Sequence, residues 1–280
     1  MIVHAHPDDE SSQTGGTLAR YAAAGCRTVL VTCTDGGQGD SADGAKPGQP
    51  GHDPHRVAAH RSDELDAAAA ALGVRVVVKL GYPDSGTLAE EAAVAEEAAV
   101  AESFSARPMM PMVTQMVRLL RLHQPDVLIT YPPNGLSGHP DHVRTHDVVA
   151  AAHANVLANG EPDATHPAGH VPRLYYIAIS ASRMRAARSA VRAAFGDDAW
   201  GPPAEMAVDD AAITTAIDVT PFWPDKLQAL AAHASQPDAA MLLQMFSAVG
   251  ERTELVHVEE YVRVHPTFRA GVIETDFFSR

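Results

Sequence analysis

Three features are scarce in this 280-residue chain: cysteine, basic side chains and long hydrophobic runs. Two cysteines, Cys26 and Cys33, are too few for a disulfide-rich fold or a cysteine-rich zinc module. Lysine and arginine number 21 against 35 aspartates and glutamates, a formal net charge of −14. Because nucleic acids and anionic membranes attract basic surfaces, this balance argues against both as partners. No apolar run reaches the roughly 20 residues that span a bilayer.

Length and composition describe an ordinary globular chain. With 46% hydrophobic and 20% charged residues, the chain can bury a large core without covalent cross-links. The first residues lack the basic and apolar stretches of a secretory signal, so a cytoplasmic protein is expected. We expect a single domain over residues 1–280, with a core over about 1–160 and a smaller α/β extension over about 161–280. Whether the chain forms a homo-oligomer is left open.

Short apolar runs alternate with helical patterns along the chain. Strands are predicted over residues 2–5, 28–34, 74–80, 126–131, 174–180 and 213–219. Helices are predicted over residues 14–24, 60–72, 113–123, 141–157, 183–195 and 221–234. The predicted strands are nearly continuous hydrophobic runs, which is typical of parallel strands covered on both faces. The pattern therefore predicts an α/β fold with a mostly parallel, Rossmann-like sheet flanked by helices.

Two segments interrupt this alternation. Residues 36–54 are rich in Gly, Pro and Asp and are predicted to form a long loop. Residues 90–101 contain the sequence EEAAVA twice in tandem, which favours a solvated surface helix or an insertion. Both are interpreted as surface features, and neither marks a domain boundary.

Histidine, in contrast, is abundant: the chain has 15, and histidine is the commonest metal ligand in proteins. The segment His-Pro-Asp-Asp-Glu over residues 6–10 directly follows the first predicted strand. The segment Gly-His-Pro-Asp-His over residues 138–142 follows the strand predicted over 126–131. Because the carboxyl ends of parallel strands line the ligand crevice, we expect these segments, about 130 residues apart, to meet at one edge of the sheet.

Together the two segments offer the donors of a catalytic metal site. Two histidines and one carboxylate, with one position left open, are the pattern of a catalytic rather than a structural zinc site. The remaining carboxylate and histidine suit a general base and an electrophile beside a metal-bound water. The same ligand set also suits Fe(II). Either segment alone is as easily explained as a turn before a helix, but two at matching strand ends are not.

These segments resemble the PIG-L/LmbE-like family of zinc-dependent N-deacetylases. The resemblance extends from Val3 to about Ala234 and includes VTCT over 31–34, the Arg and Glu-Leu of 61–65, Asp-Ser-Gly over 84–86 and His-Ala-Ser-Gln over 233–236. Within the family it is nearest to the mycothiol-type deacetylases and the mycothiol S-conjugate amidases. The implied activity is zinc-dependent hydrolysis of the N-acetyl amide of a small aminosugar substrate, and amidase-like hydrolysis is the alternative.

The resemblance assigns the central roles to five residues. The zinc ligands of the family match His6, Asp9 and His142. Asp8 matches the general base. His139 matches the residue that polarises the amide carbonyl, and we expect it to act in its protonated form.

The resemblance also implies supporting roles around this centre. Asp141 is expected to take part in catalysis by orienting an imidazole. Arg61 and Asp84 match positions that hold the hydroxyls of an aminosugar, and His233 lies near the site in relatives.

The chain departs from the mycothiol enzymes at two positions of this site. Ser137 stands where the deacetylases carry a tyrosine that assists the oxyanion, so oxyanion support falls to zinc and His139. Gln13 stands where the amidase has a lysine that helps read its thiol conjugate. A substrate other than a mycothiol precursor is therefore compatible with the pattern.

Two other classes of function are weighed against a deacetylase. A metal-dependent phosphoesterase would need ligands for two metals and a basic phosphate cradle, and the sequence shows neither. A catalytically silent sugar-binding homologue would be expected to lack a ligand or the base, and all five central groups are present. The cysteines are not candidate nucleophiles, because no histidine and aspartate are spaced to activate Cys33 and Cys26 directly follows a helix end.

Overall fold

A computed structural model describes residues 1–86, 102–159, 170–252, 257–268 and 271–278. The surface helix predicted over 90–101 lies outside the described residues. Within the described part of the chain, no helix combines the length and the hydrophobicity needed to cross a membrane.

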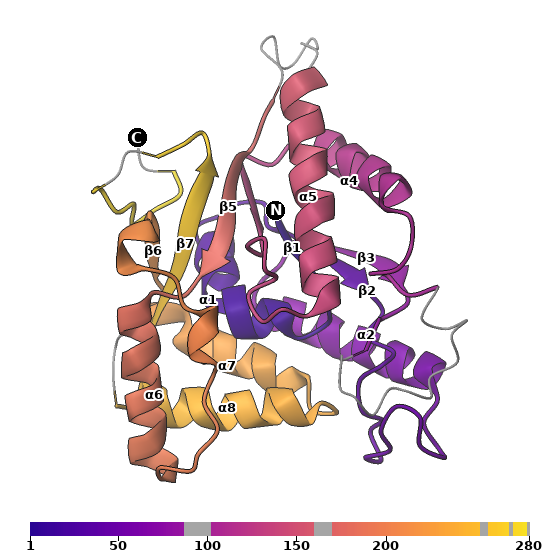
Figure 1. The fold of residues 1–280 in the computed structure, drawn as a ribbon, viewed down its shortest axis with the longest axis vertical. Coiled ribbons are helices and arrows are strands. Elements are labelled where there is room, and N and C mark those ends of the chain that lie inside the picture. The colour runs from indigo at the N-terminus through magenta and orange to yellow at the C-terminus, as the bar shows by residue number, and fades with distance from the viewer. Residues whose placement is uncertain (87–101, 160–169, 253–256, 269–270, 279–280) are drawn as a thin grey trace.

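One sheet runs through the whole molecule (Figure 1), and its described strands follow the order β3-β2-β1-β4-β5-β7-β6. The strands are β1 (Ile2–His4), β2 (Val29–Thr34), β3 (Val76–Tyr82), β4 (Val127–Thr130), β5 (Arg173–Ala178), β6 (Thr215–Asp218) and β7 (Val258–His265). Strands β1 to β5 pair in parallel, whereas β7 pairs antiparallel with both β5 and β6. The predicted mostly parallel α/β sheet is confirmed. Strands β5, β6 and β7 continue the same sheet. The division of the chain into a core and an extension near residue 160 stays a prediction.

Helices cover both faces of the sheet. They are α1 (Asp9–Ala23), α2 (Pro54–Ala71), α4 (Met109–His123), α5 (Pro140–Asn159), α6 (Ala181–Phe195), α7 (Trp223–Ala232) and α8 (Pro237–Gly250). Val3 and Leu128 pack with α4 and α5 on one face, while their strand neighbours Ile2 and Ile129 pack on the other with α1, α7 and α8. This alternation explains why the strands read as continuous hydrophobic runs: each side chain in them is buried on one face or the other.

The direction in which the chain crosses the sheet changes between β1 and β4. From β1 it proceeds outward to β2 and β3, and it then returns to β4 on the other side of β1 and continues to β5. A crevice forms outside the carboxyl ends of the strands at such a switch point, because the loops there diverge in opposite directions. The two histidine-containing segments leave the sheet at this point.

The structure corrects several predicted boundaries. The first helix begins at Asp9 rather than at residue 14, since Asp9 and Glu10 place negative charge in its first turn, where the helix dipole favours it. The helix predicted over 221–234 is a short 3₁₀ turn followed by α7. Helix α8 and strand β7 were not predicted at all. Strand β7 contains two consecutive glutamates, at 259 and 260, which do not fit the hydrophobic pattern of a buried strand. Glu259 is nevertheless buried, because Lys226 forms an ion pair with it.

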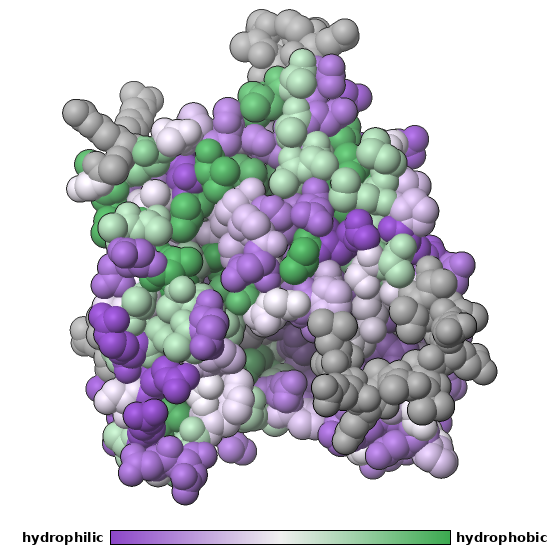
Figure 2. Space-filling view, in the orientation of Figure 1, coloured by the Kyte–Doolittle hydropathy of each residue, from purple (hydrophilic) through white to green (hydrophobic). Residues whose placement is uncertain are grey.

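Helix α6 lies at the edge of the molecule. Only Met184 and Val191 of this helix are buried, so most of its surface faces solvent. The space-filling view shows this region as largely hydrophilic, while hydrophobic residues gather over the upper parts of β5 and β7 (Figure 2).

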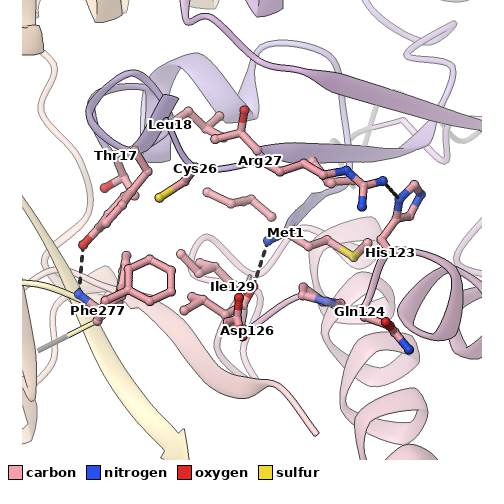
Figure 3. Close-up of a pocket in the computed structure, with 17 residues that line it drawn as sticks. Met1, Thr17, Leu18, Cys26, Arg27, His123, Gln124, Asp126, Ile129 and Phe277 are labelled. Carbon is pink, nitrogen blue, oxygen red and sulfur yellow. Dashed lines mark hydrogen bonds between the residues drawn. The ribbon is translucent and has the colours of Figure 1, made fainter. Parts of the chain in front are cut away.

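A cavity of about 380 Å³ lies at the amino-terminal ends of β1, β2 and β4. Its wall includes Met1, whose ammonium donates to the carbonyl of Val127 at 2.8 Å, and Arg27, which lies 2.8 Å from Nδ1 of His123 (Figure 3). The two histidine-containing segments follow the carboxyl ends of their strands, so this cavity is at the opposite edge of the sheet.

Candidate metal centre

The structure brings the two histidine-containing segments together. Residues 6–10 connect β1 to the start of α1, and residues 138–142 lead into α5, whose first residue is Pro140. Proline suits that position because its missing N–H would have no partner in the first turn. His6 Nδ1 lies 3.3 Å from His142 Nε2, although the two residues are 136 positions apart.

Three donor atoms form a nearly equilateral triangle. His6 Nδ1 and His142 Nε2 are 3.3 Å apart, and each lies 3.4 Å from Asp9 Oδ2. A tetrahedral ion with ligand distances of about 2.0–2.1 Å requires edges of about 3.3–3.4 Å between donors. The triangle therefore fits a zinc-like ion without rearrangement.

Two further groups of donors lie around the same histidine. His6, His139 and His142 approach one another, and so do His6, Asp84 and Asp141. Asp141 is already occupied by the backbone N–H of Ser85 at 2.9 Å and by the hydroxyl of the same serine. Of all these groups, the triangle of His6, Asp9 and His142 is the one whose donor spacing fits a tetrahedral ion directly.

The outward nitrogen of each ligand histidine has an acceptor. His6 Nε2 lies 3.2 Å from Asp141 Oδ2, and His142 Nδ1 lies 3.1 Å from the carbonyl of Gly135. A proton on each outward nitrogen leaves the inward lone pair free to bind a cation. Asp141 thus stands where the sequence analysis expected a residue that orients an imidazole.

The carboxylate of Asp9 is held by three donors. Its Oδ2 accepts from the hydroxyl of Tyr131 at 2.7 Å and from the backbone N–H of His6 at 2.9 Å, and its Oδ1 accepts from Gln13 Nε2 at 2.8 Å. Gln13, noted in the sequence only as a departure from the amidase, therefore contacts a ligand.

Sequence reasoning missed Tyr131. Its hydroxyl also accepts from the backbone N–H of Ala5 at 3.0 Å, and its ring stacks on that of His142 with centroids 4.2 Å apart. The signal was its position: Tyr131 ends the strand predicted over 126–131, directly before the turn that leads to the second segment. Ser85 was likewise quoted only as part of a motif.

Asp8 lies beside the triangle with its carboxylate one quarter exposed. Arg61 Nη2 donates to its Oδ2 at 3.0 Å. Burial raises the pKa of Asp8 to about 6, and the neighbouring Arg61 guanidinium opposes that rise. A carboxyl with a pKa close to the working pH is suited to exchange protons.

His139 is held as a neutral ring. Burial, and then the neighbouring imidazoles of His6 and His142, lower its pKa to about 4. Its Nδ1 accepts the backbone N–H of Asp141 at 3.2 Å, so the proton of the neutral ring resides on Nε2. We expected a protonated His139 from the sequence. In this structure burial and the imidazoles of His6 and His142 outweigh the opposing charges of Asp141 and Asp84, which favours the neutral ring.

Arg61 and Asp84 are buried behind the site. Arg61 is 5% exposed, and its guanidinium donates to the carbonyls of Gly36 at 2.8 Å and Pro7 at 2.6 Å as well as to Asp8. Asp84 accepts the backbone N–H of Gly86 at 2.9 Å. Arg61 links the loops that follow β1 and β2, and Asp84 Oδ1 lies 3.5 Å from His6 Nε2. Contact of either side chain with a sugar stays a prediction.

A triangle of three protein donors, with a carboxylate and an imidazole beside it, is the pattern of a catalytic rather than a structural metal centre. Fold and site thus define an α/β enzyme with a site suited to a metal ion. The family model PIG-L, described as GlcNAc-PI de-N-acetylase, matches residues 1–153, and the chain belongs to this family. This confirms the resemblance seen in the sequence.

Individual relatives agree with this membership. A 1D-myo-inositol 2-acetamido-2-deoxy-alpha-D-glucopyranoside deacetylase of Rhodococcus erythropolis is 36% identical over 245 residues, covering 86% of this chain and 81% of the relative. Among solved structures, N,N'-diacetylchitobiose deacetylase from Pyrococcus horikoshii has a TM-score of 0.60 at 20% identity, covering 95% of this chain and 85% of that one. The 4-carboxy-2-hydroxymuconate hydratase GalB from Pseudomonas putida has a TM-score of 0.62 at 17% identity, with 97% and 98% covered. A hydratase shares the fold, so the fold by itself does not decide the reaction.

Proposed function

We propose that this chain is a zinc-dependent N-deacetylase that hydrolyses the acetamide of a small N-acetylated aminosugar and releases acetate and a free amine. The observation that carries the proposal is the donor triangle of His6, Asp9 and His142, with Asp8 and His139 beside it. Fe(II) fits the same donor set, because two histidines and a carboxylate also suit that ion.

His6, Asp9 and His142 would hold the ion. When bound there, the ion would supply Lewis-acid polarisation of the amide carbonyl and of the attacking water. Asp141, Gly135 and Tyr131 keep the ligands in place, because each accepts from or donates to a ligand side chain.

Asp8 takes the proton of the attacking water. Its carboxylate contacts Arg61 and is one quarter exposed, so water can reach it and it can accept a proton. The same proton is then available for the departing amine, which must be protonated before it leaves.

His139 stabilises the negative charge that develops on the carbonyl oxygen. Its Nδ1 accepts the backbone N–H of Asp141, so the proton of the neutral ring is on Nε2. This Nε2–H is the donor that remains for the carbonyl oxygen of the substrate. A neutral N–H donor contributes electrostatic stabilisation without first requiring protonation of the ring.

The proposed substrate class is a glycoside of 2-acetamido-2-deoxyglucose. It is supported by the name of the Rhodococcus erythropolis relative and by the net charge of −14, which suits a neutral sugar better than an anionic one. A cytoplasmic location is part of the proposal, and it is supported by the two cysteines, Cys26 and Cys33, which are both free thiols.

The test is to incubate the zinc-loaded chain with a panel of N-acetylated aminosugars and their glycosides, and to measure both free amine and acetate. We expect equal release of the two products, and the Asp8→Asn variant should keep its metal but lose nearly all turnover. Absence of amine from every N-acyl substrate would refute the deacetylase. Full activity of Asp8→Asn would refute the role of Asp8 as the base but would leave the deacetylase activity itself standing.

A further inference from the structure

A fully buried acid–base pair lies directly behind the proposed base. Glu10, in the first turn of α1, and His233, at the end of α7, are both 0% exposed. His233 Nε2 lies 2.8 Å from Glu10 Oε1, although 223 positions separate the two residues. The reaction proposed above uses neither residue.

The second oxygen of Glu10 accepts the backbone N–H of Asp8 at 3.0 Å. Asp8 has φ 105° and ψ −26°, in the left-handed half of conformational space that a residue with a Cβ rarely adopts. Such a conformation persists only where the surroundings impose it. Glu10 is the side chain that accepts the N–H of Asp8 in this conformation.

The conformation of Asp8 has a consequence for its side chain. Asp8 occupies the N-cap position of α1, where an aspartate with an extended backbone normally accepts a hydrogen bond from the first turn. In this structure its side chain makes no capping bond and contacts Arg61 instead. The left-handed backbone therefore keeps the carboxylate free of the helix.

The pair is anchored from behind. Ser11 Oγ donates to Glu10 Oε1 at 2.5 Å, and Ser235, two residues after His233, donates through its N–H to Glu64 of α2 at 2.7 Å. The other ring nitrogen of His233, Nδ1, is buried and has no hydrogen-bond partner among the described residues.

We propose that Glu10 and His233 are positioning residues that hold Asp8 in the left-handed conformation and so keep its carboxylate available as the base. The inference rests on the proposed function. Without the pair, Asp8 relaxes to an extended N-cap, its carboxylate accepts from the first turn of α1, and turnover falls while the ligand triangle stays intact.

The chain offers a matched control. Glu259 and Lys226 form another buried pair, each 3% exposed and 2.6 Å apart. Lys226 also belongs to α7, and Glu259 also accepts backbone N–H groups of α1, those of Gly16 at 3.0 Å and Thr17 at 2.8 Å. This pair has the same kind of anchoring but does not contact Asp8.

The experiment compares the double variants Glu10→Met/His233→Met and Lys226→Met/Glu259→Met in the zinc-loaded chain. Replacing both members of a buried pair by apolar residues of similar size leaves no unpaired charge in the pair. The N–H of Asp8 in the first variant, and those of Gly16 and Thr17 in the second, lose their acceptors, so the folding of both variants is checked by urea unfolding. For the first variant we expect kcat at least tenfold lower, with KM within twofold and one metal per chain. For the second we expect kcat within twofold of the parent. Glu10→Gln, which keeps an oxygen acceptor for the N–H of Asp8, should retain more activity than Glu10→Met.

The outcomes separate this inference from the proposed function. If the parent chain releases no amine, the proposed function fails. If the parent is active and the first double variant keeps its kcat, the positioning role is wrong. A crystal structure of that variant gives an answer independent of activity, because φ of Asp8 should become negative, and a value that stays near 105° overturns the inference.

Discussion

Replacing Tyr131 with phenylalanine is the most direct probe of how the metal centre is held. The substitution removes one hydroxyl, which donates to Asp9 Oδ2 at 2.7 Å and accepts the N–H of Ala5 at 3.0 Å, and it preserves the ring that stacks on His142. One of the three donors to the ligand carboxylate is thereby lost. The buried N–H of Ala5 and His4 Nδ1, which lies 3.2 Å from the hydroxyl, also lose their partner.

The two losses have different magnitudes and different readouts. Removing the hydrogen-bonding partner of a metal ligand typically costs about 10–100-fold in metal affinity, or about 1.4–2.7 kcal/mol. The unpaired N–H of Ala5 should lower the free energy of unfolding by about 1–3 kcal/mol. Zinc affinity is measured by competition with a chromophoric chelator, and stability by urea unfolding of the metal-free protein.

Tyr175→Phe is the matched control. Tyr175 is also fully buried, and its hydroxyl donates to a carboxylate, Glu274 Oε2, at 3.2 Å. This variant should lose stability to a similar degree while its zinc affinity stays unchanged. If Tyr131→Phe lowers only stability and leaves zinc affinity at the parent value, the argument that Tyr131 supports the ligand is refuted.

Three further predictions follow from single contacts. His142→Ala should abolish stoichiometric metal, measured by elemental analysis after desalting, and a variant that retains one ion per chain would contradict its place in the triangle. Because burial raises the pKa of Asp8 to about 6 and a base acts unprotonated, kcat/KM should fall about tenfold per pH unit below about pH 6, and a rise on acidification would show that Asp8 is not the base. Gly16→Ala should lower the free energy of unfolding by about 1–3 kcal/mol, because its Cβ would lie 2.5–2.8 Å from three carbons of Val219. Gly201→Ala, whose nearest neighbour would be at 3.7 Å, is the control and should change stability by no more than about 0.5 kcal/mol.

The sequence predicted those parts of the fold whose pattern is local. The strands over 28–34 and 126–131 were found within a residue or two, because their side chains are buried on both faces and leave a continuous apolar run. Strand β7 was missed, because Glu259 is buried through a partner in α7 that no local pattern reveals. Helix α1 was recognised but placed too late, since its first turn consists of polar residues of the site.

The residue types of the candidate site were also evident from the sequence. His6, Asp9 and His142 follow two strands whose carboxyl ends lie at the same edge wherever the sheet is parallel, so strand direction alone predicts that they share that edge. That β1 and β4 are neighbours comes from the structure. The roles of the neighbours were not evident. Tyr131 looked like the last residue of a strand, and only the packing of β4 beside β1 shows that its hydroxyl contacts Asp9.

The sequence by itself determined that this chain forms a mostly parallel α/β sheet with two clusters of metal-ligand residues at one edge, because periodicity and strand direction are properties of short segments. Only the tertiary structure decided which nitrogen of each histidine faces inward, that His139 is neutral, and that Glu10 and His233 meet behind Asp8. These features depend on contacts between residues far apart in the chain and on the burial those contacts produce. Burial and neighbouring charge set a proton's position, and neither exists until the elements have packed.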